Sequence, residues 1–216
     1  MKEYHLSKDV AKLLTSDPTY LHLFEETVQE ALNDLDCSSN PPSENIADVR
    51  KTIASSVSKW ICNEYMSLLN SMEDDLSEDV MNITLSMTSQ QLGQLIAMIH
   101  DETISKRTAK QILRFLHKQY WDTKCQNNKE ETQTKQPRDI ANEKGWNMIS
   151  DPSQIRSLCL QTIHKFDSHW EQYKEGDDKK KWKMEKFLMG KVMTESGGNV
   201  HPEKMKTILK KVLEGH

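Results

Sequence analysis

Apolar residues recur every three or four positions along most of this chain, which is the spacing of one buried face on an α-helix. No run alternates apolar and polar residues between turn residues, as a half-buried strand would. The helical pattern therefore predicts an all-α fold. It covers residues 8–14, 17–35, 45–70, 88–99 and 105–121, and later residues 137–145, 151–166, 179–193 and 202–212.

Side chains that can cap a helix stand in front of several of these runs. Each can accept a hydrogen bond from a free backbone N–H group of the first helical turn. They are Asp17 and Asp151, each followed by proline, Thr88 with Gln91 three residues later, and Ser105. Gly145 can end the short helix that Pro137 opens. Gly190 costs about 1 kcal/mol relative to alanine inside a helix, which indicates that another backbone approaches it closely.

The acidic and basic residues are unevenly distributed along the chain. Residues 1–87 hold 16 acidic and 6 basic side chains, whereas residues 88–216 hold 17 and 23. The acidic stretch SMEDDLSEDVMN lies where the sign changes. We therefore expect two small helical bundles in tandem, residues 1–87 and 88–216, the second one favouring polyanions. A solvated surface without a partner explains the imbalance equally well.

The residue types that carry catalysis or bind metals form no recognisable pattern. The four cysteines, Cys37, Cys62, Cys125 and Cys159, include no C-x-x-C pair. No nucleophile elbow, Walker loop or paired-carboxylate motif is present. The acidic residues Asp74, Asp75, Glu78 and Asp79 lack the turn glycine and the spacing of a calcium loop. The sequence predicts no catalytic residue, no metal site and no bound cofactor in this chain.

Basic residues are the stronger lead to function. Lys106, Arg107, Lys110 and Arg114 recur at spacings of three and four, so they share one surface of a helix. A second group consists of Lys180, Lys181, Lys183 and Lys191, with further lysines and Trp182 nearby. Such cations contact phosphates, and an exposed aromatic ring can stack on a base. The alternative is a solubilising helix face with Trp182 in the core.

Several short motifs, in order along the chain, resemble the C-terminal part of the B subunit of the aspartyl/glutamyl-tRNA amidotransferase. They are residues 13–16, 68–70, 103–105 with 109–110, 143–145 with 149–151, 187–193 and 199–202. The resemblance implies that residues 1–87 are the helical domain of the family. It also implies that residues 88–216 are its tail domain, which occurs elsewhere as a stand-alone protein of the YqeY type.

This resemblance implies a function that composition alone does not indicate. The family's complex converts misacylated Glu-tRNA(Gln) into Gln-tRNA(Gln) with ATP and magnesium, and an amidase subunit and a small accessory subunit are its partners. The resemblance implies that the part matched here holds the tRNA, and we expect the eight cations named above to contact it. The ATP-binding cradle domain would precede Met1, so we expect a piece of a longer, mitochondrial protein. The alternative is a helical scaffold that docks partner subunits without touching tRNA.

Overall fold

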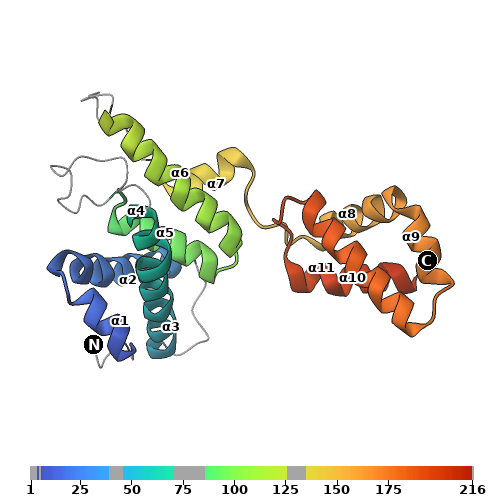
Figure 1. The fold of residues 1–216 in the computed structure, drawn as a ribbon, viewed down its shortest axis with the longest axis horizontal. Coiled ribbons are helices and arrows are strands. Elements are labelled where there is room, and N and C mark those ends of the chain that lie inside the picture. The colour runs from blue at the N-terminus through green and yellow to red at the C-terminus, as the bar shows by residue number, and fades with distance from the viewer. Residues whose placement is uncertain (1–3, 5, 39–45, 71–85, 126–134, 216) are drawn as a thin grey trace. The chain divides into compact units, whose positions relative to one another are not determined.

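The computed structural model describes residues 4, 6–38, 46–70, 86–125 and 135–215, and every regular element in these ranges is a helix (Figure 1). The predicted all-α class is confirmed. The chain divides into two compact units, Met1–Gly145 and Trp146–His216. Within the described residues, no helix is long and apolar enough to cross a membrane.

The first unit contains seven α-helices and one π-helical segment among its described residues. They are α1 (Lys8–Leu14), α2 (Pro18–Ser38), α3 (Ile46–Lys59), the π-helix η1 (Trp60–Tyr65), α4 (Met66–Asn70), α5 (Ser89–His100), α6 (Lys106–Cys125) and α7 (Pro137–Lys144). The predicted caps are confirmed. Asp17 accepts from Thr19 N at 2.7 Å, and Ser105 accepts from Thr108 N at 3.1 Å. Thr88 forms a reciprocal capping box at the start of α5.

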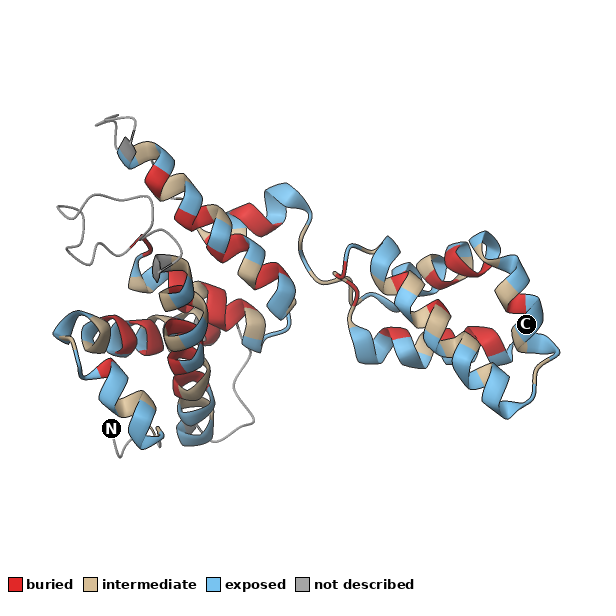
Figure 2. Cartoon of the chain, in the orientation of Figure 1, coloured by how far each residue is buried: buried red, intermediate tan, exposed pale blue. Residues whose placement is uncertain are grey.

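The core of the first unit is built mainly where α2 packs against α5, with α3 alongside. Figure 2 shows the buried positions along the inward faces of these helices. Fully buried side chains from the three helices include Phe24, Ile53, Leu92 and Leu95. These apolar faces cover one another, so none of the three helices would be stable alone.

The boundary predicted near residue 87 does not coincide with the division between the units, which falls after Gly145. The helix that follows residue 87, α5, has its apolar face against α2. Arg138 of α7 also pairs with Asp34 of α2, with Nη2 and Oδ2 2.7 Å apart. Apolar packing rather than charge composition therefore sets the unit. The acidic stretch of residues 71–82, with its four named carboxylates, lies outside the described residues.

The helix predicted over residues 45–70 is interrupted by the π-helix η1. This segment buries Trp60, Ile61 and Tyr65. The hydroxyl of Tyr65 accepts a hydrogen bond from Met87 N at 3.2 Å and lies 3.2 Å from Ser86 Oγ. Ser86 Oγ in turn lies 2.7 Å from Nδ1 of His117 on α6. This buried polar chain fastens η1 to α6 and to the segment that precedes α5.

Residues 146–215 of the second unit form four helices: α8 (Pro152–Lys165), α9 (Asp167–Lys174), α10 (Asp178–Glu195) and α11 (Pro202–Glu214). Asp151 caps α8 as predicted, accepting from Gln154 N at 2.9 Å. Residues on α8, α10 and α11, among them Cys159, Leu188 and Leu209, form its core. The short helix α9 was not predicted, because its only buried residue is Trp170 and so it has little apolar periodicity.

Of the two predictions made for glycines, one is confirmed and one is not. Gly145 has a φ of 63° and ends α7, as predicted. The prediction that a backbone approaches Gly190 is wrong, because among the described residues a Cβ there would meet no atom within 4 Å beyond its chain neighbours and its own helix backbone.

Candidate nucleic-acid interface

Helix α6 presents a row of cations opposite its buried face. The buried side contains Ala109, Ile112, Leu113 and Leu116. At about 100° per residue, the cations fall within an arc of about 120° around the helix. We call this row the α6 basic face; it consists of Lys106, Arg107, Lys110, Arg114 and Lys118. Lys118 was not among the predicted cations, although its spacing of four residues from Arg114 was the available signal.

One member of the α6 basic face already has an acidic partner. Lys110 Nζ lies 2.7 Å from Glu64 Oε1, which belongs to η1. Both side chains are partly exposed, at 44% and 31%. The other four members are exposed, and the described residues supply no ion pair for any of them. These four cations are therefore open to an anionic partner.

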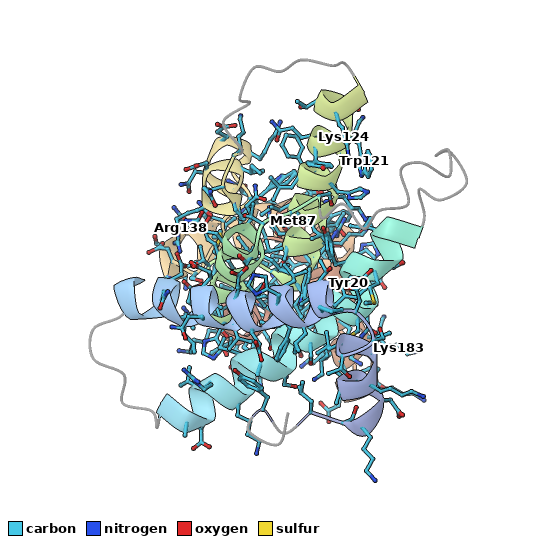
Figure 3. All side chains as sticks on the ribbon, turned by 90° about the vertical axis from the view of Figure 1, so that its left-hand side faces the viewer. Tyr20, Met87, Trp121, Lys124, Arg138 and Lys183 are labelled. Atoms are coloured by element: carbon cyan, nitrogen blue, oxygen red, sulfur yellow. The ribbon has the colours of Figure 1, made fainter. Side chains whose placement is uncertain are left out.

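The C-terminal turns of α6 are aromatic. The Lys124 Nζ atom lies 5.2 Å from the ring centre of Trp121, which Figure 3 shows beside it. It lies 5.6 Å from the ring centre of Tyr120. These are cation–π distances. The two rings are themselves arranged edge to face, with centres 5.4 Å apart.

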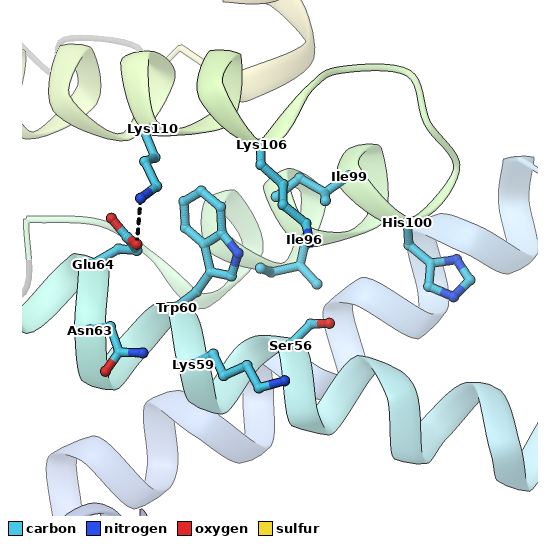
Figure 4. A pocket seen from close by; sticks show the side chains of 10 residues that line it. All are labelled: Ser56, Lys59, Trp60, Asn63, Glu64, Ile96, Ile99, His100, Lys106 and Lys110. Carbon is cyan, nitrogen blue, oxygen red and sulfur yellow. Dashed lines mark ion pairs between the residues drawn. The ribbon is translucent and has the colours of Figure 1, made fainter. Parts of the chain in front are cut away.

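A pocket of about 440 Å³ lies beside the α6 basic face, within the first unit. We call it the Trp60 pocket. Its lining comes from α3 and η1 on one side, from α6 on another, and from the C-terminal half of α5. Figure 4 shows the Trp60 indole standing between the Lys110–Glu64 pair and Ile96. The polar lining residues are Ser56, Lys59, Asn63, Glu64, His100, Lys106 and Lys110.

In the second unit, helix α10 has a basic face of its own. Lys179, Trp182, Lys183 and Lys186 recur at spacings of three and four, and the three lysines are exposed. We call this set the α10 basic face. Trp182 is 56% exposed, so it does not belong to the core. The Lys186 ammonium lies 4.0 Å from the centre of the Trp182 ring.

The four cations predicted on α10 do not share one face. Only Lys183 belongs to the α10 basic face, and Lys180 is exposed on the adjoining side. Lys181 is half-buried, with its ammonium 6.0 Å from the ring centre of Tyr173. Lys191 is also half-buried, 5.0 Å from the ring of Phe166 and 5.2 Å from that of Phe187. The side chains of Lys181 and Lys191 therefore lie over aromatic rings of the second unit.

Burial makes two cysteine thiols of the described residues poor nucleophiles. Burial raises the pKa of the Cys159 thiol to about 11, so this thiol is protonated at neutral pH and is a poor nucleophile. Burial also raises the pKa of Cys62. No three His, Cys, Asp or Glu side chains of the described chain converge on a metal position. The donors of the described residues therefore do not form a site that fits a magnesium ion.

Residues 44–213, which include both basic faces, match the profile of the GatB domain, named GatB_Yqey. The chain belongs to this family. The matched region spans α3 to α11, so both units contribute to the GatB domain match.

Curated relatives of this GatB domain chain are B subunits of tRNA amidotransferases. The mitochondrial B subunit of the glutamyl-tRNA(Gln) amidotransferase of Phytophthora infestans is 30% identical over 82% of the chain and 27% of that protein. The chloroplastic/mitochondrial B-1 subunit of Micromonas pusilla is 27% identical over 97% of the chain and 31% of that protein. The aspartyl/glutamyl-tRNA(Asn/Gln) amidotransferase B subunit of Thermotoga petrophila is 28% identical over 100% of the chain and 36% of that protein. The chain thus spans about a third of the length of these relatives.

Proposed function

We propose that this chain is the tRNA-binding C-terminal portion of the B subunit of a glutamyl-tRNA(Gln) amidotransferase. It would serve the ATP-dependent conversion of misacylated Glu-tRNA(Gln) to Gln-tRNA(Gln) during translation. The observation that carries the proposal is the exposed α6 basic face within a GatB domain match that covers residues 44–213. The names of the relatives supply the reaction and its tRNA substrate.

The physical role of the α6 basic face is to contact the phosphate backbone. Cations that neutralise phosphates release condensed counterions, which supplies much of the affinity for nucleic acid and makes it depend on salt. Arg107 and Arg114 can each engage a phosphate through two parallel hydrogen bonds. The α10 basic face, with the exposed ring of Trp182, is the second contact surface in this proposal.

The remaining parts of the reaction belong to other polypeptide segments. We assign ATP and magnesium to the part of the full-length relatives that this chain does not span, because its described residues offer no fitting donor set. An amidase subunit that releases ammonia from glutamine and a small accessory subunit would be the protein partners. The names of two relatives favour an organelle, and we propose the mitochondrion.

The test is a titration of the purified chain with tRNA(Gln) in a gel-shift assay at several salt concentrations. The triple variant Arg107→Ala, Arg114→Ala, Lys118→Ala should bind more weakly at every salt concentration. Its plot of log affinity against log salt should be shallower by about one for each phosphate that a removed cation had neutralised. Lys110 is left intact because its pairing with Glu64 would complicate the result.

The matched control is Lys8→Ala with Lys12→Ala, which removes exposed cations from α1 in the same unit. This control should bind tRNA as the unchanged chain does. Equal binding by the triple variant would remove the α6 basic face from the proposal. Absence of all tRNA binding in the unchanged chain, together with salt-resistant capture of a partner subunit, would favour the protein-docking scaffold instead.

A further inference from the structure

The Trp60 pocket is built around the one π-helical segment among the described residues. η1 contributes Trp60, Asn63 and Glu64 to its lining. A π-helical turn inside an α-helix is less stable than regular helix and frequently occurs at functional sites. Here it sets the faces of three lining positions, because the wider turn changes the register of the side chains that follow Lys59. The location of the π-helix and the location of the pocket coincide.

The lining of the pocket combines three kinds of group. Lys59 on α3 and Lys106 and Lys110 on α6 supply three ammonium groups, of which Glu64 pairs with one. Asn63 supplies an amide that can donate and accept hydrogen bonds. The indole of Trp60 is 7% exposed, and this small aromatic surface forms part of the pocket wall (Figure 4). The net cationic charge favours an anion, while the amide and the indole favour a planar polar ring.

We propose that the Trp60 pocket holds a single unpaired nucleotide of a bound RNA. Its phosphate would lie between Lys59 and Lys106, and its base would contact the small exposed part of Trp60 with one edge toward Asn63. The volume of about 440 Å³ falls in the range of sites that enclose small ligands. This inference rests on the proposed function, since the RNA is the tRNA that the α6 basic face contacts.

A double helix fits this pocket poorly and a single strand fits it well. In a duplex the faces of the bases are stacked on one another, so they are not available to an aromatic ring. Single-stranded loops and ends instead expose bases that stack on aromatic rings and hydrogen-bond along their edges. The Lys110–Glu64 pair links α6 to η1 at this pocket, next to Trp60. The pocket therefore distinguishes unpaired from paired RNA, which the α6 basic face does not.

The experiment measures binding of a fluorescein-labelled, 5′-phosphorylated tetraribonucleotide to the full chain by fluorescence anisotropy. A blunt RNA duplex, AMP and inorganic phosphate serve as competitors. The variant Lys59→Ala, Asn63→Ala alters two exposed residues, so the fold should persist, which circular dichroism checks. We expect it to bind the tetranucleotide about tenfold more weakly. AMP should compete more strongly than phosphate. The duplex can compete only through the α6 basic face, so it should bind the double variant as tightly as it binds the parent chain.

The control is Lys51→Ala, which removes an exposed lysine from α3 outside the pocket lining. It should leave tetranucleotide binding unchanged. A second readout follows the indole N–H resonance of Trp60, assigned by its disappearance in Trp60→Phe, which should shift on adding AMP. Unchanged binding by the double variant, no shift of that resonance, or competition by phosphate equal to AMP would each overturn the proposal.

The two proposals fail separately. If tRNA binding depends on Arg107, Arg114 and Lys118 but the tetranucleotide does not bind, only the pocket proposal falls. If the tetranucleotide binds at the pocket while tRNA does not bind at all, the proposed function falls and the pocket remains a nucleotide site.

Discussion

Gly93 of α5 lies directly against Glu30 of α2. A Cβ placed on Gly93 would come within 2.6 Å of the Glu30 Cβ and within 2.9 Å of the Ala31 backbone nitrogen. No side chain can occupy that space unless the two helices separate. This close approach ties a helix before residue 87 to a helix after it, so the first unit must fold as one body.

Replacing Gly93 with alanine should therefore destabilise the first unit. The added methyl group meets backbone as well as side-chain atoms, and backbone atoms of a packed helix cannot rotate away. We expect a loss of about 1–3 kcal/mol in the free energy of unfolding, as for other overpacked cores. Urea unfolding followed by far-ultraviolet circular dichroism measures it. A Gly93→Ala chain as stable as the parent would show that α2 and α5 do not pack this closely.

Gly190→Ala is the matched substitution, and it should raise the free energy of unfolding rather than lower it. In the described part of the chain, a Cβ there meets no atom of another element within 4 Å, and Gly190 lies inside α10. Alanine should stabilise the second unit by about 0.5–1 kcal/mol because it restricts the unfolded chain. The same unfolding measurement applies. If Gly190→Ala is less stable than the parent, another part of the protein must lie close to Gly190.

Local signals predicted the helices well, and long-range packing explains what they missed. Asp17, Thr88, Ser105 and Asp151 cap helices through bonds to residues two or three positions away, so their role is readable from sequence. The close approach at Gly93 depends on Glu30, which is 63 positions earlier in the chain. No local pattern distinguishes Gly93 from Gly190, and the sign change in charge near residue 87 carries no information about which apolar faces meet.

The buried His117 should make the stability of the first unit depend on pH. Burial lowers the pKa of its imidazole below the usual 6.5. Below about pH 6.5 the unfolded chain therefore binds a proton that the folded chain does not, so the free energy of unfolding falls as pH is lowered from 7 toward 5. Urea unfolding at several pH values should show this decline. In His117→Gln the part of the slope due to His117 should be absent.

The same substitution carries a cost at neutral pH. His117 Nδ1 lies 2.7 Å from Ser86 Oγ, and weakening this buried hydrogen bond should cost about 1–2 kcal/mol. His164→Gln is the control, because His164 is exposed on α8. If the free energy of unfolding of His117→Gln falls between pH 7 and 5 as much as that of the parent, groups other than His117 cause the decline.

The sequence indicated which cations lie on α6 but not how each is partnered. Spacings of three and four placed Lys106, Arg107, Lys110 and Arg114 on one side of the helix, and the geometry agrees. The pairing of Lys110 with Glu64 joins residues 46 positions apart and follows from the packing of α6 near η1. The π-helix that positions Glu64 has no sequence signature, because the apolar spacing of residues 45–70 suits an ordinary helix equally well.

Glu64→Gln should strengthen RNA binding and barely change stability. A partly exposed ion pair contributes about 1 kcal/mol or less, so the free energy of unfolding should change by no more than that. The substitution releases the Lys110 ammonium and removes a carboxylate that repels phosphate. Two unit charges about 4 Å apart in water interact by about 1 kcal/mol, so affinity for tRNA should rise up to about fivefold.

Glu143→Gln supplies the comparison for that prediction. Its partner Lys135 lies 2.7 Å away on the same unit, but neither residue belongs to the α6 basic face. Gel-shift titrations at about 0.05 and 0.2 M salt should show the gain for Glu64→Gln only, and the gain should shrink at the higher salt. Weaker binding by Glu64→Gln would mean that Glu64 positions Lys110 for the RNA rather than competing with it.

Trp182 should matter for RNA binding and not for folding. Its ring is 56% exposed and lies among the cations of the α10 basic face. Trp182→Ala should change the free energy of unfolding by less than about 0.5 kcal/mol, as at other exposed sites. If a base stacks on this ring, the affinity of Trp182→Ala for tRNA should fall by about 1–3 kcal/mol, roughly 5- to 150-fold. Trp182→Phe should keep most of the parent's affinity, because its ring can still stack.

Trp170 is the contrast in the same unit, because only 7% of it is exposed. Trp170→Ala should lose about 3–5 kcal/mol of stability. Comparing the two variants by calorimetry and by tRNA titration separates an aromatic ring that builds the core from one that contacts a ligand. If Trp182→Ala binds tRNA as tightly as the parent while remaining folded, the α10 basic face is a solvated surface, and RNA binding is confined to the first unit.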